Sequence, residues 1–254
     1  MKILVSNDDG IYSRGILHLA ESLSEIGEVV VVAPRTEQSA VGHSITMQLP
    51  LRIREYKLSD KICGYAIDGT PADCIKIGIK NIMKEQPDIV VSGINHGANT
   101  AISIIYSGTV SAAREAAIMG CPAIAFSITD HKPKYFEFAR KIAKELTQKV
   151  VQYGLNQGTL LNVNIPNIPE NEIRGILPTQ QGKSKWDDIY EERIDPYGNK
   201  YYWLTGTMTD IDTEIHNDQI AVKNNYVSVT PIQFDLTDYK AYDLLKTWNL
   251  SKPE

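Results

Sequence analysis

Two adjacent carboxylates, Asp8 and Asp9, directly follow the apolar run KILVS at positions 2–6. Like charges this close repel each other, which raises the pKa of one of them unless a cation neutralises the pair. A hard divalent ion takes oxygen ligands, and the neutral oxygens of Ser39 and Asn95 would complete its ligand set while leaving positions for water and substrate. The pair therefore predicts one divalent metal ion, Mg2+ or Mn2+, with Ca2+ as a stand-in in crystals. The alternative is a turn followed by a helix N-cap.

The segment YSGTVSAAREA at 106–116 has small residues at the expected start of a helix. The amides of Gly108 and Thr109, with the hydroxyl groups of Ser107 and Thr109, would form an anion site at that helix N-terminus. The alternative is that Ser107 is an ordinary N-cap and that the small residues allow close helix packing. An anion site beside a metal ion indicates phosphoryl chemistry, and we assign Asn99 to the same substrate site.

Two further side chains are candidates for supporting roles near Ser39. His43 lies in the same loop, and we select it for proton transfer or for contact with a metal ligand; the alternative is a structural or solvated histidine. Arg35 precedes Ser39 by four residues and would either contact a substrate phosphate or cap a turn.

These residues must be positioned by the strands and helices around them. Continuous apolar runs at 2–6 and 29–33 are typical of strands buried on both faces. The segment between them, RGILHLAESLSEI, predicts a helix with Ile16, Leu19, Leu23 and Ile26 at helical spacing. Further strands are predicted at 88–95, 122–128 and 160–166, with helical stretches ADCIKIGIKNIM and GTVSAAREAAIM before the first two and a long helix near 133–153.

Strands that alternate with helices imply βαβ units, and therefore an α/β fold whose mostly parallel sheet carries flanking helices. In an open parallel sheet, ligands bind outside the carboxyl ends of the strands. The loops that hold Asp8, Asp9, Ser39 and Asn95 all follow strands, so we expect these side chains to face one crevice.

The pattern changes after about residue 170. The segments KYYWLTGTMTD and NNYVSVTPI alternate like antiparallel strands and predict an appended β-hairpin extension. The last stretch predicts a C-terminal helix whose apolar face is made by Leu236, Tyr239, Tyr242, Leu245 and Trp248. We therefore expect a catalytic core at 1–180, a β extension with a returning strand at 181–235 and a C-terminal helix at 236–254.

Composition excludes several classes of protein. The 254 residues are 43% hydrophobic and carry a net charge of −5, which fits a globular chain of one or two domains without a basic face for a nucleic-acid duplex. Its three cysteines show no metal-type spacing, and no apolar run reaches the roughly 18 residues of a membrane span. We expect a cytoplasmic protein. No P-loop, dinucleotide fingerprint or GxSxG elbow is present.

Several motifs in order along the chain resemble the SurE (survival protein E) family of nucleoside 5'-monophosphate phosphatases. They are ILVSNDDG, VAPRTEQSAVGHSIT, GTPADC, VVSGINHGANT and YSGTVSAAREA, with YVSVTP near residue 230. The resemblance implies a divalent-metal-dependent 5'-nucleotidase of broad nucleotide range, with 3'-nucleotidase and exopolyphosphatase side activities in some members. It also implies a Rossmann-like core, an extended hairpin and a C-terminal segment exchanged between subunits of a homodimer, often paired into tetramers.

The family's metal ligands fall on Asp8, Asp9, Ser39 and Asn95, and its anion-binding stretch falls on residues 107–109. In the mechanism that this implies, Asp8 or Asp9 orients or deprotonates the attacking water, with direct aspartyl attack as a variant. Two other classes stay open: a binding module without turnover, and a glycosyl- or nucleotidyltransferase. The segment 183–220 departs from the family pattern.

Overall fold

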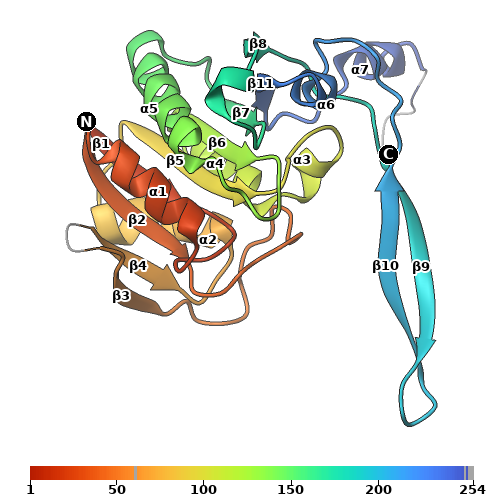
Figure 1. The fold of residues 1–254 in the computed structure, drawn as a ribbon, viewed down its shortest axis with the longest axis horizontal. Helices are drawn as coiled ribbons and strands as arrows, with labels where there is room; N and C mark the ends of the chain where they lie inside the picture. The colour runs from red at the N-terminus through yellow and green to blue at the C-terminus, as the bar shows by residue number, and fades with distance from the viewer. Residues whose placement is uncertain (60–61, 249, 251–254) are drawn as a thin grey trace.

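The computed structural model describes residues 1–59, 62–248 and 250 of the chain (Figure 1). Within these residues, nine strands form one sheet in the order β3-β4-β2-β1-β5-β6-β7-β11-β8, and β9 and β10 form a separate hairpin. The strands are β1 (Lys2–Ser6), β2 (Glu28–Pro34), β3 (Ile53–Lys57), β4 (Cys63–Ile67), β5 (Ile89–His96), β6 (Ala123–Ile128), β7 (Thr159–Ile165), β8 (Gly175–Pro178), β9 (Trp186–Ile194), β10 (Lys200–Met208) and β11 (Tyr226–Gln233). The helical segments are α1 (Arg14–Leu23), α2 (Pro71–Ile77), η1 (Gly78–Met83), α3 (Ser103–Tyr106), α4 (Gly108–Ile118), α5 (Phe136–Tyr153), η2 (Glu170–Glu172), α6 (Asp218–Lys223) and α7 (Tyr239–Leu245).

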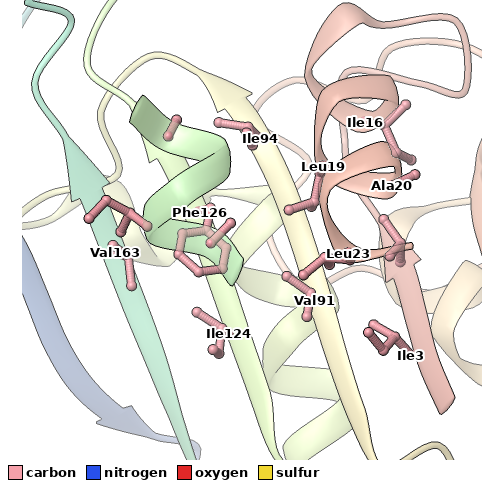
Figure 2. Packing of buried hydrophobic residues seen from close by; sticks show 14 of the residues in the cluster. Ile3, Ile16, Leu19, Ala20, Leu23, Val91, Ile94, Ile124, Phe126 and Val163 are labelled. Carbon is pink, nitrogen blue, oxygen red and sulfur yellow. The ribbon is translucent and has the colours of Figure 1, made fainter. Parts of the chain in front are cut away.

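Helices cover both faces of the sheet because the central strands are apolar on both sides. In β1, Ile3 and Val5 belong to the core cluster that also holds α1 and α5 residues, whereas Leu4 belongs to the cluster that holds α2 and α4 residues. Figure 2 shows the first cluster, in which Leu19 and Leu23 of α1 are turned toward the central strands. Side chains that alternate along β1 thus join both layers to one sheet.

The predicted parallel sheet is confirmed in its central part. Strands β4, β2, β1, β5, β6 and β7 pair in parallel with one another, so their carboxyl ends meet at the same edge. Each crossover runs through a helix or a long loop, as parallel pairing requires. The loops after β1, β2 and β5 carry the predicted site residues, and the sheet brings them together.

Some elements differ from the sequence prediction. Helix α1 ends at Leu23, and Ile26 lies beyond it, half-buried against the core. The predicted helix before β5 is α2 followed by the π-helical segment η1. Strands β3 and β4, which pair antiparallel at one sheet edge, were not predicted, because β3 is mostly exposed and lacks a buried apolar run.

The strand NNYVSVTPI belongs to the main sheet and not to an appendage. It forms β11, which pairs antiparallel with β7 and parallel with β8. Its inner residues Val227, Ser228 and Thr230 are buried, and this burial explains the position in the sheet. The β9-β10 hairpin, in contrast, projects away from the body of the molecule as a long ribbon (Figure 1).

Helix α7 lies within the predicted C-terminal helix but is shorter than the stretch 236–248. None of its residues is buried in the single chain. The predicted segment 236–254 includes residues 249 and 251–254, which lie outside the described part of the chain. Among the described helices, none has the length and hydropathy to cross a membrane.

Candidate active site

One cavity of about 1090 Å³ opens at the carboxyl ends of β1 and β5. The sequence-predicted residues that line it are Asp8, Asp9, Ser39, Asn95, Asn99 and Ser107. These residues span about a hundred positions in the chain, and the parallel topology brings them to one edge of the sheet. The remaining predicted residues, Gly108, Thr109, His43 and Arg35, are not among the lining residues.

Asp8 is buried and its carboxylate faces the start of α4. The Thr109 hydroxyl donates a hydrogen bond to Asp8, and the backbone amides of Gly108 and Thr109 also donate to it. Burial raises the pKa of Asp8 above its ordinary value, and these hydrogen bonds act against the rise. A side chain at position 108 would place its Cβ 2.7 Å from the Asp8 Cβ, so glycine is required for the close approach.

The helix donors that we assigned to phosphate therefore already have a partner in Asp8. Ser107 is the N-cap of α4, and its Oγ accepts a hydrogen bond from the Val110 amide over 3.1 Å. The hydroxyl proton of Ser107 is still able to donate, and Ser107 lines the cavity. Of the three residues of the predicted anion site, Ser107 is the one that faces the space where a ligand would bind.

Asp9 has a different environment from Asp8. Burial, the nearby charge of Asp8 and that of Glu37 raise the pKa of Asp9 to about 7, against a backbone hydrogen bond from His96. Its Oδ2 atom is buried and has no hydrogen-bond partner among the described residues. A buried carboxylate oxygen without a partner, next to a second carboxylate, is the arrangement that a bound cation would complete.

Asn95 reaches the cavity through an irregularity in β5. The register between β5 and β6 shifts between Ser92 and Asn95, which is the mark of a β-bulge, and bulges redirect side chains near binding sites. Gly93 at the bulge has φ +133°, a conformation that other residues rarely adopt. The Asn95 Nδ2 atom donates to the Gly97 carbonyl over 2.8 Å, so Oδ1 is the atom that would bind the predicted metal ion.

Ser39 lies on an exposed loop that several contacts hold in place. The Gln38 amide donates to the Asp8 carbonyl over 2.8 Å, and the Gly42 amide donates to the Tyr106 carbonyl over 3.0 Å. The Ser39 hydroxyl donates to the carboxylate of Glu37, which also lines the cavity. Glu37 is a third cavity carboxylate that sequence reasoning missed, although its position two residues before Ser39 was a usable signal.

The two predicted supporting residues make structural contacts outside the cavity. Arg35 forms an ion pair with Asp68, which favours the structural alternative for this residue over phosphate binding. His43 Nε2 lies 2.8 Å from Glu115 Oε2 of α4, so it ties the Ser39 loop to that helix. His43 therefore supports the position of a predicted ligand and has no contact with the cavity.

Asn99 is held by a buried polar network that the sequence reasoning also missed. Its backbone amide donates to Asn164 Oδ1 over 2.8 Å, and its backbone carbonyl accepts hydrogen bonds from Nδ2 of Asn162 and of Asn164. Its own Nδ2 donates to Ser127 Oγ over 2.9 Å. The signal was the pair of asparagines in the otherwise apolar strand LLNVNIP, because buried asparagine requires hydrogen-bond partners.

The cavity wall away from Asp8 and Asp9 is formed partly by the β9-β10 hairpin, which the sequence analysis did not assign to the site. The lining residues from the hairpin and the segment before it are Lys185, Trp186, Asp188, Leu204, Thr205 and Gly206. Ile102, Ser103 and Tyr106 come from α3 and the residue before it, and His96 and His131 also line the cavity. The site thus has an acidic end at the sheet and a mixed, partly aromatic end at the base of the hairpin.

The fold and the site define a Rossmann-like α/β protein whose sheet edge carries an acidic crevice. A family model described as "Survival protein SurE" matches residues 3–188. The chain belongs to the SurE family.

Curated relatives match it over nearly their whole length. The "5'-nucleotidase SurE" of Chlorobium limicola is 49% identical over 250 residues, covering 98% of this chain and 97% of that protein. The protein of the same name from Syntrophobacter fumaroxidans is 48% identical over 250 residues, covering 98% of this chain and 100% of the relative. The crystal structure of SurE from Aquifex aeolicus has a TM-score of 0.84 and 44% identity, and the match covers 97% of this chain and 98% of that one.

Proposed function

We propose that this chain is a phosphoric monoester hydrolase, a divalent-metal-dependent 5'-nucleotidase that converts nucleoside 5'-monophosphates to nucleoside and phosphate. The relatives named 5'-nucleotidase SurE support the reaction class. The observation that carries the proposal for this site is the Asp8 and Asp9 pair in the cavity, with Asp9 Oδ2 left without a partner among the described residues. The proposal extends to 3'-nucleotidase and exopolyphosphatase side activities, which the family resemblance implies.

The donor set fits one hard divalent ion, Mg2+ or Mn2+. Asp8, Asp9, Ser39 and Asn95 all line the same cavity and offer oxygen atoms only. When bound, the ion would neutralise charge that develops on the phosphoryl group and would lower the pKa of a water molecule.

The side chains of the cavity would supply the proton acceptor, a hydrogen bond to the phosphate and a rigid floor. Because the Asp8 carboxylate is engaged by Thr109 and by the α4 amides, Asp9 is the carboxylate that would accept a hydrogen bond, and then a proton, from the attacking water, through the oxygen that does not bind the ion. The Ser107 hydroxyl would donate to a phosphate oxygen. The buried network around Asn99 would hold the floor of the cavity rigid, so that the phosphate keeps one position.

The proposed working form is a homodimer or homotetramer in the cytoplasm. The hairpin and α7 expose large apolar side chains such as Tyr190, Trp203, Tyr239 and Leu244 in the single chain, and a second copy would cover them. Exchange of the C-terminal segment between subunits, which the resemblance implies, would achieve this. All three cysteines are free thiols, which agrees with a reducing compartment.

One assay separates this proposal from its rivals. Phosphate release from AMP, GMP and p-nitrophenyl phosphate is measured with Mg2+ or Mn2+ and with EDTA. A hydrolase releases phosphate from each of them with metal and stops with EDTA. A binding module releases none, and a glycosyl- or nucleotidyltransferase also releases no inorganic phosphate from these monoesters, with or without an acceptor. Full activity in EDTA would contradict the metal assignment.

A further inference from the structure

The cavity is larger than a phosphate group needs, and its two ends differ in chemistry. Its volume of about 1090 Å³ corresponds to pockets that hold whole small-molecule ligands. The acidic end, with Asp8, Asp9 and Asn95, lies at the sheet. The opposite end is formed by Ile102 and Tyr106 on one side and by hairpin residues on the other. With the proposed metal ion at the acidic end, a ligand that fills the cavity would place its phosphate there and an apolar, flat group at the opposite end.

The base of the hairpin is fixed to the body of the molecule, although the rest of the hairpin projects freely (Figure 1). The buried Asp218 accepts hydrogen bonds from the amides of Ala101 and Gly182 over 2.9 Å and 3.0 Å. Asp212 accepts from the amides of Lys183 and Ser184 over 2.7 Å and 3.0 Å. Two carboxylates thus anchor the residues directly before β9.

Trp186, the first residue of β9, is tied to α3. Its Nε1 atom donates to Ser103 Oγ over 3.3 Å, which links the indole to the segment that also carries Tyr106. Trp186 is 45% exposed and Tyr106 is 53% exposed, although both line the cavity. Two partly exposed aromatic side chains that line one cavity, on elements linked by a hydrogen bond, form a preorganised site for a planar ring.

We infer that the base of the hairpin is the nucleobase subsite of this enzyme, with Trp186 and Leu204 on one side of the base and Tyr106 on the other. The inference rests on the proposed function and goes beyond it, because it assigns substrate selection to the segment 185–206. Stacking on an aromatic face tolerates every base, since each has a π-face. Lys185 and Asp188 in the same wall supply a donor and an acceptor for the polar edge of the ring.

The subsite explains why a phosphatase of this kind would prefer nucleotides to other phosphate esters. A substrate with the same ribose and phosphate but without a base makes the contacts at the acidic end and none at the hairpin. The binding energy from the base is remote from the reacting bond, so its loss is expected to raise KM more than it lowers kcat.

The test compares AMP with ribose 5-phosphate in the full-length protein and in Trp186→Ala. We expect kcat/KM for AMP to fall about ten-fold or more, mainly through KM, as for the loss of one base-aromatic stack. Turnover of ribose 5-phosphate should stay within about two-fold, which also shows that the variant is folded. Trp186→Phe should restore most of the AMP preference, because phenylalanine retains an aromatic face.

Tyr153→Ala is the control, since Tyr153 is an aromatic residue of α5 that is 76% exposed, lies outside the hairpin and does not line the cavity. It should leave the AMP to ribose 5-phosphate ratio unchanged. Equal losses on both substrates in Trp186→Ala, or an unchanged ratio, would overturn the subsite.

Calorimetric titration with adenosine separates a failed subsite from a failed function. The wild type should bind adenosine, and Trp186→Ala should bind it about ten-fold more weakly. This result would stand even if neither phosphate ester were hydrolysed, which would be a failure of the proposed function alone. Equal adenosine affinity in the two proteins would overturn the subsite regardless of catalysis.

Discussion

Asp8 and Asp9 are neighbours in the chain, yet the structure treats their charges differently. Asp8 accepts hydrogen bonds from Thr109 and from the first amides of α4, where the helix dipole favours a negative charge. Asp9 receives a backbone hydrogen bond at His96, but its Oδ2 atom has no partner in the described part of the chain. The uncompensated charge of the pair is therefore on Asp9, and a cation has most to contribute there.

At this scale we expect Asp8→Asn and Asp9→Asn each to lower turnover by about 100-fold or more, which corresponds to about 2.7 kcal/mol of barrier. Each substitution removes one negative charge from the proposed metal site at nearly constant volume, so folding should survive. The measurements are kcat under saturating Mn2+ and calorimetric Mn2+ affinity, which should weaken in both variants.

Asp243→Asn is the control for these substitutions, because it removes one charge from an exposed side chain of α7 that pairs with Lys246. It should leave kcat and Mn2+ affinity unchanged. If Asp9→Asn kept more than half of the wild-type turnover under saturating metal, Asp9 would not be a metal ligand.

Helix α4 serves two loops at once. Its first turn donates hydrogen bonds to Asp8. Glu115, in the middle of the helix, contacts His43 of the Ser39 loop. Glu115 Oε1 also lies 2.5 Å from Lys76 Nζ of α2. Burial acts to raise the pKa of Glu115, but the hydrogen bonds from His43 and Lys76 outweigh it, and the pKa is lowered. The ionised Glu115 therefore stabilises the folded protein and fixes the loop that carries a predicted metal ligand.

Glu115→Gln should lower the free energy of unfolding at pH 7 by about 2 kcal/mol, between the values typical of exposed and buried pairs. Because the folded-state pKa lies below the ordinary 4.5, the carboxylate contributes fully above pH 4.5, and its contribution disappears as the pH falls through the lowered value. The difference between variant and wild type should thus narrow in strongly acidic solution. Urea unfolding of both proteins at pH 7, 5 and about 3.5 measures this difference in the free energy of unfolding.

The exposed pair of Lys149 and Glu145 on α5 provides the matched control. Glu145→Gln should cost about 0.5 kcal/mol or less at pH 7, because exposed pairs contribute little. An effect of Glu115→Gln no larger than that of Glu145→Gln would contradict the role of α4 in holding the loop.

Most elements that sequence patterns predicted are those whose burial is visible in composition, whereas β10 and α7 were predicted from their periodicity although both are largely exposed. Strands β1, β2, β5, β6 and β7 are apolar on both faces, and the long α5 is amphipathic, so period and run length sufficed. The edge strand β3 and the hairpin strand β9 are exposed almost throughout, and exposed strands leave no burial pattern to detect.

The candidate site also has a part that could be predicted from the sequence and a part that could not. The acidic end could be predicted because adjacent carboxylates repel each other unless a cation neutralises them, and because parallel strands bring the loops that follow them together. The contribution of Trp186 could not, because its contact with Ser103 joins segments that are distant in sequence. Glu37 and Asn164 left local signals in the sequence, but their contacts with Ser39 and Asn99 became apparent only in the structure. Trp186 lies in the segment 183–220, where the family pattern gave no guidance.

Two of the apolar surfaces that the described residues expose are candidates for contacts between subunits. One runs along the hairpin and includes Tyr190, Tyr202 and Trp203; the other is α7 with its flanks, where Leu236 is 94% exposed. A monomer rarely exposes apolar patches of this kind, and two distinct self-contacting surfaces on one subunit generate a closed tetramer with dimers as intermediates.

We therefore expect the full-length protein to be a dimer or tetramer at micromolar concentration and each surface to be separable by mutation. Deletion of residues 236–254 should lower the assembled mass and expose apolar surface, while Trp203→Glu should lower it independently, because a buried unpaired charge is costly at an interface. Tyr153→Glu, a change at an isolated aromatic residue of α5 that is 76% exposed, should leave the mass unchanged. Size-exclusion chromatography with light scattering decides the matter: a monomeric full-length protein would overturn the assembly and leave the metal site untouched.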